Sequence, residues 1–202
     1  EKTNNKKNIK IIAVSKTFEI SHINPLIEHG HTDFGENKVQ EAVEKWTEIK
    51  KNNKRIKLHL IGRLQTNKAK AAVSLFDYIH SLDSKKLADK IALYQDEQNK
   101  KIKLFIQVNI GDEVQKSGVS KNEVSDFYKY CKSINLDILG LMCIPPFNKD
   151  SLGYFIEMKK LPMNPLYLLR VVCIILLPLN FTNSLCLEDP NNTFAKIPKE
   201  IF

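Results

Sequence analysis

Lys16 is the residue of this sequence whose type and position most favour chemistry. It lies near the end of an apolar, β-branched-rich run over residues 8–17, whose composition predicts a strand buried on both faces. The carboxyl ends of such strands are where α/β proteins bind ligands and carry out reactions. The competing interpretation is a solvated lysine, because most lysines lie at the surface. Position alone leaves both open.

The elements that must position Lys16 form a regular alternation of strands and helices. Further strands are predicted over residues 33–37, 57–62, 78–82, 104–110 and 136–144, and helices over 24–30, 36–49 and 67–76, from Ser84, from Ser120, and over 150–161. These six strand-helix units favour an α/β fold of the (β/α)₈ TIM-barrel type. A doubly wound sheet is the weaker candidate, since none of the seven glycines forms a Gly-x-Gly-x-x-Gly run after a strand.

The alternation stops at Leu161, which divides the chain into a predicted barrel domain, residues 1–161, and an aberrant tail, residues 162–202. The tail holds an apolar run over residues 171–179, flanked by Arg170 and interrupted by Pro178. A membrane span needs about 20 mostly apolar residues, so a buried strand or misfit segment is favoured. The last two βα units are not recognisable, and the barrel is therefore predicted to be incomplete.

Charge and cysteine content limit the partners of the chain. The net charge is +8 over 202 residues, but the lysines are mixed with acidic residues along the helices, which predicts a solvated surface and no nucleic-acid partner. The four cysteines are widely spaced, without a Cys-x-x-Cys pair, which argues against zinc and against a disulfide framework. With no apolar core of a signal peptide in residues 1–8, we expect a cytoplasmic protein without a membrane segment.

Several short runs together resemble one family. They are residues 13–17 (Ala-Val-Ser-Lys-Thr), 34–37 (Phe-Gly-Glu-Asn) with 39–41 (Val-Gln-Glu), 59–62 (His-Leu-Ile-Gly) with 64–68 (Leu-Gln-Thr-Asn-Lys), 107–110 (Gln-Val-Asn-Ile) with 116–118 (Lys-Ser-Gly), and 140–145 (Gly-Leu-Met-Cys-Ile-Pro). In their order and spacing over residues 9–161, these runs resemble the YggS/PROSC family of pyridoxal phosphate homeostasis proteins.

The resemblance implies a barrel like the N-terminal domain of alanine racemase, with pyridoxal 5′-phosphate (PLP) held as an imine on Lys16. Such a lysine must lose its proton, which partial burial near other cations favours. Asn37 would face the same mouth and hydrogen-bond the cofactor, or it is a turn residue at a helix start. His59 is either a neighbour of the cofactor ring or a core histidine. Asn67 lies near the site or caps its helix, and Met142 packs on the ring or in the core.

The chain departs from the family at both ends. The N-terminal helix of the family is mostly absent, and its closing Ser-Met-Gly-Met-Ser and Arg-Ile-Gly-Thr runs have no match after Leu161. Those runs resemble the phosphate-holding loops after strands seven and eight of barrels. We therefore hypothesise that the tail is translated out of frame or through a retained intron, which translation of the surrounding DNA in all frames would test.

Three functions follow from these observations. The first is a monomeric PLP carrier or regulator in PLP homeostasis, without catalytic turnover of its own. The second is a PLP-dependent amino-acid racemase-like enzyme, which would need an acid/base group opposite Lys16 from a further domain. The third is a defective truncated or frameshifted family member. PLP titration separates the third function from the first two, and a racemisation assay separates the second from the first.

Overall fold

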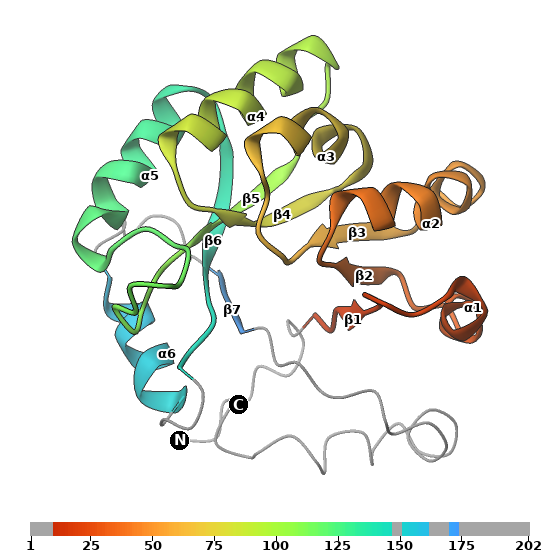
Figure 1. Cartoon of the computed structure of the whole chain (residues 1–202), viewed down its shortest axis with the longest axis horizontal. Coiled ribbons are helices and arrows are strands. Elements are labelled where there is room, and N and C mark those ends of the chain that lie inside the picture. Colours follow the sequence, from red (N-terminus) through yellow and green to blue (C-terminus); the bar gives the residue numbers. More distant parts are fainter. Residues whose placement is uncertain (1–9, 147–150, 162–169, 174–202) are drawn as a thin grey trace.

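The computed structural model describes residues 10–146, 151–161 and 170–173, and within these ranges it forms one parallel sheet of seven strands. The strands follow the order of the sequence and the helices cover the outer side of the curved sheet (Figure 1). The strands are β1 Ala13–Val14, β2 Asp33–Glu36, β3 Lys57–Leu60, β4 Tyr78–Leu82, β5 Lys103–Gln107, β6 Asp137–Cys143 and β7 Arg170–Cys173. The helices are α1 Ile20–Glu28, α2 Val39–Asn52, α3 Ala69–Leu75, α4 Lys85–Glu97, α5 Val124–Ser133 and α6 Ser151–Lys160, with short 3₁₀ turns η2 Thr66–Lys68 and η3 Lys121–Glu123. This is the α/β barrel architecture that the sequence predicts.

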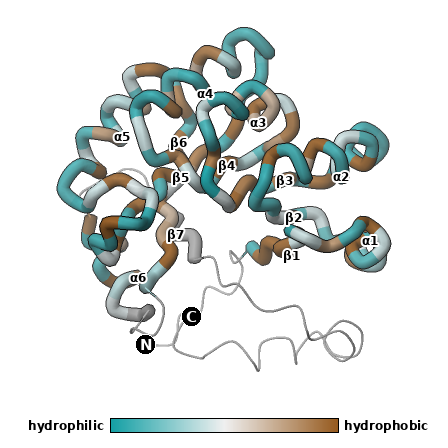
Figure 2. The backbone as a smooth tube through the Cα atoms, in the orientation of Figure 1, coloured by the Kyte–Doolittle hydropathy of each residue, from teal (hydrophilic) through white to brown (hydrophobic). Residues whose placement is uncertain are grey.

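Strand alternation sorts the side chains into two layers. Phe34 and Leu58 share a register position and pack against the helices, where Trp46 of α2 is fully buried. Gly35 and His59 share the next position and face the inside of the barrel. Figure 2 shows the apolar residues concentrated along the strands and on the helix sides that face them. The helix-facing layer is the main hydrophobic core, and the inner layer carries the polar groups described below.

The strand β1 differs from its prediction. Only Ala13–Val14 forms a ladder, and both residues are half-buried, whereas a longer strand buried on both faces was expected. Among the described residues β1 pairs with β2 alone, and Ile11 is 53% exposed. An edge strand without a second neighbour leaves one side open, which explains the partial exposure. The residues before Lys10 lie outside the described part of the chain.

A second difference lies in the tail, where residues 170–173 form β7. This strand pairs in parallel with β6, with Leu141 opposite Val171 and Met142 opposite Val172. The sequence suggested a buried strand near this apolar run but not its place as a seventh barrel strand, because no helical or strand period surrounds it. No ladder joins β7 to β1 within the described ranges, so the barrel is open between them there. The rest of the tail, including residues 174–202, lies outside the described residues.

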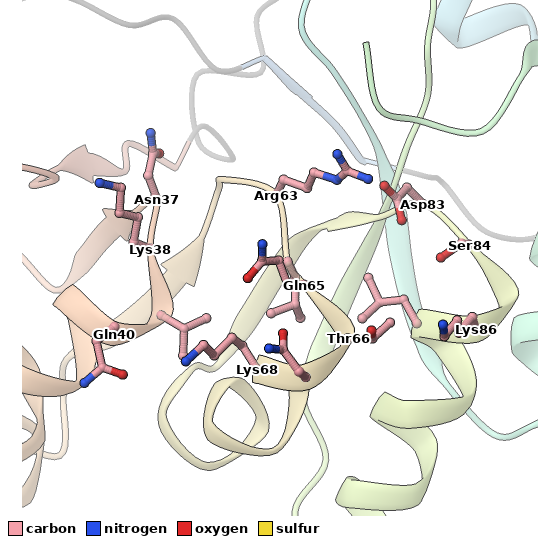
Figure 3. Close-up of a pocket in the computed structure, with 14 residues that line it drawn as sticks. Asn37, Lys38, Gln40, Arg63, Gln65, Thr66, Lys68, Asp83, Ser84 and Lys86 are labelled. Atoms are coloured by element: carbon pink, nitrogen blue, oxygen red, sulfur yellow. The ribbon is translucent and has the colours of Figure 1, made fainter. Parts of the chain in front are cut away.

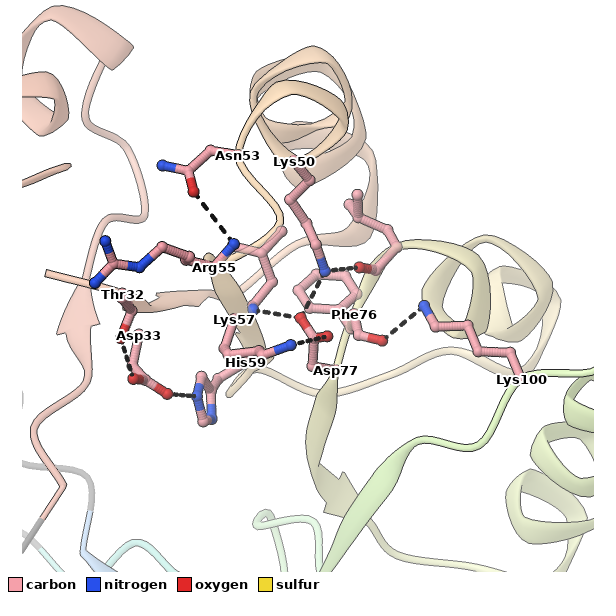
Figure 4. A network of polar contacts seen from close by, with 12 residues as sticks. Thr32, Asp33, Lys50, Asn53, Arg55, Lys57, His59, Phe76, Asp77 and Lys100 are labelled. Atoms are coloured by element: carbon pink, nitrogen blue, oxygen red, sulfur yellow. Dashed lines mark hydrogen bonds and ion pairs between the residues drawn. The ribbon is translucent and has the colours of Figure 1, made fainter. Parts of the chain in front are cut away.

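Asp77 fixes the edge of the sheet at which the strands begin. Its carboxylate accepts the backbone N–H of Leu58 at 2.8 Å and pairs with Lys50 of α2 at 2.5 Å (Figure 4). Lys100, at the end of α4, donates to the Phe76 carbonyl oxygen at 3.0 Å. These bonds tie α2, α3 and the segment after α4 to β3 and β4 at the edge where the strands begin. None of the helices in the described ranges is long and apolar enough to span a membrane.

Candidate functional site

Lys16 lies two residues after the end of β1, in a turn formed by Lys16 and Thr17. The preceding residue, Ser15, still pairs with β2 through its backbone N–H. Ser15 faces α2, because its hydroxyl donates to Glu36 Oε1 at 2.9 Å. Continued alternation directs Lys16 to the opposite side, toward the barrel, and the register of Val14 with Gly35 sets Lys16 beside Asn37. The Lys16 side chain is half-buried and has no ion-pair partner among the described residues.

A cavity of about 300 Å³, here called the mouth cavity, opens where β2, β3 and β5 end. Its walls include Asn37, Gly62, Arg63, Gln107, Asn109 and Lys116. This volume lies at the lower end of the range of about 300–1,000 Å³ typical of small-molecule sites. Four amide side chains, with Gln115 as the fourth, and two cations in one small cavity suit a ligand that is both polar and anionic.

Gly62 sets the shape of the mouth cavity between β2 and β3. A Cβ atom added at Gly62 would lie 2.3 Å from the Asn37 carbonyl oxygen, a contact that real side chains do not make. The backbones of Asn37 and Gly62 therefore approach each other as closely as they do because residue 62 has no side chain. This contact fixes the backbone position of Asn37.

The loop after β5 forms the opposite wall and is closed by its own polar groups. The Asn109 side chain donates to the Glu113 carbonyl oxygen at 2.9 Å and accepts from the Glu113 N–H at 3.1 Å. Gln107 Nε2 donates to the Ser117 carbonyl oxygen at 3.0 Å. Lys116 pairs with Glu113 at 2.7 Å, which neutralises part of its charge. The conformation of the loop is thus held by hydrogen bonds and an ion pair between its own residues.

A larger cavity of about 820 Å³ lies beside the mouth cavity and shares Asn37 and Arg63 with it. It is lined by the first turns of α2, η2 and α4, and Asn67 is among its walls (Figure 3). Lys38, Arg63, Lys68 and Lys86 are its cations and Asp83 is its single acidic residue. All four cations are exposed, so the cavity is a solvated, electropositive depression.

His59 lies inside the barrel and lines neither cavity. Its Nε2 lies 3.0 Å from Asp33 Oδ1 (Figure 4). Its Nδ1 lies 2.9 Å from His80 Nε2. Burial lowers the pKa of His59, although Asp33 opposes this, and burial lowers the pKa of His80 to about 3. Both rings are therefore neutral near pH 7, which gives a unique proton arrangement: His59 donates through Nε2 to Asp33, and His80 donates through Nε2 to His59.

This geometry favours the core-histidine interpretation of His59. Met142 is likewise fully buried inside the sheet and lines neither cavity, while its register partner Gln107 does line the mouth cavity. Of the five residues predicted for the site, Asn37 lines both cavities and Asn67 lines the larger one, whereas Lys16, His59 and Met142 line neither.

The structure adds residues that the sequence argument did not single out. Gln107, Asn109 and Lys116 stand in the runs that carried the resemblance, and Arg63 stands between two of those runs. Arg63 directly follows a predicted strand, whereas Gln107 and Asn109 lie within one and Lys116 lies in the loop after it. No signal in the sequence pairs His59 with Asp33, because 26 residues separate them and only the sheet register brings them together.

Comparisons with known proteins agree on one family. The sequence model described as "Alanine racemase, N-terminal domain" matches residues 2–159. Proteins named "Pyridoxal phosphate homeostasis protein" match at 41% identity in Pasteurella multocida, over 70% of this chain, and at 37% in Haemophilus influenzae, over 72%. The matched segments span 61% and 62% of those relatives, so the chain covers less than two thirds of their length.

A solved structure supports the same assignment. PipY of Synechococcus elongatus PCC7942, determined with PLP bound, superimposes with a TM-score of 0.67 at 31% identity. The superposition covers 75% of this chain and 71% of PipY. PipY therefore resembles this chain in both sequence and fold.

Proposed function

The chain belongs to the family of pyridoxal phosphate homeostasis proteins, and from that membership we propose that it binds PLP, with Lys16 as the covalent attachment point, and serves in PLP homeostasis. The observation that carries the proposal is the place of Lys16 just after the carboxyl end of β1, at the same edge of the sheet as the mouth cavity, although Lys16 itself does not line that cavity. When bound, PLP supplies an aldehyde that condenses with a primary amine and releases water.

The described residues fit the attachment and ring end of such a cofactor. Lys16 is half-buried and without an ion-pair partner in the described ranges, so its amine is not already committed to a carboxylate. Asn37 offers an amide to a ring hydroxyl or nitrogen, and the contact with Gly62 holds it in place. His59 and Met142 support this wall from within the barrel and do not themselves reach the cavity.

Two cations that line the mouth cavity, Arg63 and Lys116, are available to bind the phosphate group of PLP. Arg63 lies at the rim shared by the two cavities and has no ion-pair partner in the part of the chain that the structure describes. A guanidinium presents several N–H donors in a fixed plane, which suits a phosphate group. Lys116 is the second candidate, although its pairing with Glu113 reduces its charge. We propose that Arg63 and Lys116 contribute the phosphate contacts available within the described ranges.

The proposal extends to setting and activity. We place the protein in the cytoplasm, as a monomer, with PLP as its small-molecule partner and without a nucleic-acid partner or catalytic turnover. Cys131 is a buried cysteine outside any disulfide, which suits a reducing compartment. Light scattering of the purified chain tests the monomer. Racemisation of added L-alanine by the PLP-loaded protein would instead support a racemase-like enzyme.

Titration of the full chain with PLP tests the central proposal. We expect a visible absorption band from lysine-bound cofactor and, after borohydride reduction, a mass increase on the peptide that contains Lys16. Lys16→Ala should abolish both, whereas Lys38→Ala, which removes an exposed lysine of the neighbouring cavity, should leave both unchanged. A band that survives in Lys16→Ala would refute Lys16 as the attachment point.

A further inference from the structure

Polar groups of β2 and α2 hold the residues on both sides of Lys16. The Ser15 N–H donates to the Gly35 carbonyl oxygen at 2.9 Å, and the Ser15 carbonyl oxygen accepts from Lys45 Nζ at 2.9 Å. On the other side, the Thr17 N–H donates to Glu41 Oε1 at 2.7 Å. The backbone that carries Lys16 is thus fixed one residue before it and one residue after it.

Glu36 is the centre of this arrangement. Its side chain is fully buried, and one oxygen, Oε1, accepts from Ser15 Oγ at 2.9 Å, Lys45 Nζ at 3.0 Å and Trp46 Nε1 at 2.9 Å. A buried carboxylate requires such donors, because an unpaired charge in the interior is strongly unfavourable. Glu36 therefore ties the turn after β1 to α2 through contacts that cannot shift independently.

Thr17, in the turn after β1, has a strained backbone conformation. Its φ angle is 64°, in the left-handed region that β-branched residues rarely adopt. Such a conformation costs on the order of 1–3 kcal/mol and persists where the surroundings impose it. The bond from the Thr17 N–H to Glu41 is the described contact that imposes it, and the strained residue follows Lys16 directly.

The same contacts distinguish Lys16 from its neighbour Lys45. Lys45 Nζ pairs with Glu36 at 3.0 Å and with Glu41 at 3.6 Å, and its side chain is 10% exposed. An amine held in ion pairs with two carboxylates is not free to approach a ligand. Lys16 has no such pairing among the described residues, so the arrangement leaves Lys16 as the available amine at this edge of the sheet.

We infer that Glu36, Glu41 and Lys45 are positioning residues for Lys16: they fix the turn after β1 and with it the place of the Lys16 amine, while Lys45 itself is held in ion pairs with both carboxylates. This inference rests on the proposed attachment of PLP to Lys16. It adds that attachment depends on three charged side chains that need not touch the cofactor.

The test uses Glu41, which is half-buried at the start of α2 and can be replaced without emptying the core. Glu41→Ala removes the acceptor of the Thr17 N–H, and Glu41→Gln keeps one. Glu44→Ala is the matched control, because Glu44 is an exposed carboxylate on the same helix. Each full-length variant is titrated with PLP, reduced with borohydride and mapped by peptide mass, with circular dichroism as the check on folding.

We expect Glu41→Ala to weaken PLP binding by about tenfold, the effect of losing one charge-assisted hydrogen bond, and to spread the reduced label from Lys16 to other lysines. Glu41→Gln should recover most of the affinity and the site selectivity. In Lys45→Met, Lys16 labelling should fall further, while Lys45→Arg should restore it. A merely structural role would lower the melting temperature without changing which lysine is labelled.

The outcomes separate the two levels of the argument. If the wild-type chain shows no band, or is labelled at another lysine, the attachment itself is wrong. If the wild-type chain is labelled at Lys16 and Glu41→Ala behaves as Glu44→Ala does, attachment stands and the positioning role is refuted. Labelling of Lys45 in the wild-type chain would also overturn the inference.

Discussion

The buried His80 makes the stability of this protein sensitive to mild acid. His80 is 1% exposed and its ring is stacked on Phe105 at a centroid distance of 4.6 Å. Its Nε2 is engaged with His59, and its Nδ1 has no hydrogen-bond partner among the described groups. Protonation would place a charged N–H at Nδ1 in an apolar setting without an acceptor. Burial accordingly lowers the pKa of His80 from 6.5 to about 3.

The sign of the pH dependence follows from this shift. The unfolded chain binds a proton at residue 80 as the pH falls below about 6.5, whereas the folded chain does not until the pH approaches 3. The contribution of neutral, buried His80 to the free energy of unfolding is therefore fully present above pH 6.5, and it is lost progressively as the pH falls from 6.5 to 3. The slope is about 1.4 kcal/mol per pH unit for one such histidine. At pH 4.5 the loss from His80 is about 2.7 kcal/mol.

Other groups around His80 do not cancel this effect. His59 also has its pKa lowered by burial, so it adds a loss of the same sign. Burial raises the pKa of Asp33, but hydrogen bonds from His59, Lys10 and Thr32 hold it well below its usual range, so Asp33 stays charged at pH 4.5. Lys10 and Lys103 lie over the Tyr78 ring, with Nζ 5.8 Å and 5.4 Å from the ring centroid.

Urea unfolding at pH 7, 6, 5 and 4.5 measures the effect. His80→Gln keeps an N–H donor for His59 but cannot take a proton, so its free energy of unfolding should fall less steeply, by about 1.4 kcal/mol per pH unit. With a urea dependence of about 1–3 kcal/mol per M, the wild-type midpoint should fall by roughly 1–3 M more than that of the variant at pH 4.5. His29→Gln, at an exposed histidine, should retain the wild-type slope. Equal slopes in the wild-type chain and His80→Gln would refute the neutral, buried His80.

Two further predictions concern the mouth cavity and a buried thiol. Gly62→Ala should shift Asn37 and lower PLP affinity in a spectral titration, because the added Cβ would lie 2.3 Å from the Asn37 carbonyl oxygen; unchanged affinity would mean that the two backbones can separate freely. Burial raises the pKa of Cys131 to about 12, so its peptide should remain unlabelled by iodoacetamide at pH 8 in the native protein and become labelled in urea; labelling in the native state would contradict its burial.

The sequence predicted the elements well where the period was strong and local. The strand Tyr78–Leu82 has the predicted bounds, and α2 carries the predicted stripe, with Val39, Ala42 and Trp46 buried. The helix predicted over residues 24–30, with Pro25 in its first turn, starts too late in the sequence. The helix α1 begins at Ile20 and includes Pro25. Pro25 lies beyond the first turn, so it removes the N–H that would bond the Ser21 carbonyl, and its position inside the helix did not mark the helix start.

Contacts between distant residues decide what the sequence could not show. Lys16 was located by its place at a strand end, but what fixes it depends on Glu36, Glu41 and Lys45, which are 20 to 29 residues away in the chain and meet it only because β1 and β2 are paired. In the run Phe-Gly-Glu-Asn, residues 34–37, the sequence pointed to Asn37 as a site residue. The buried residue that bonds the turn after β1 is its neighbour Glu36. A strand that alternates its side chains between barrel and helix can therefore serve one site twice: Asn37, just after β2, lines the cavity, and Glu36 holds the turn that carries Lys16.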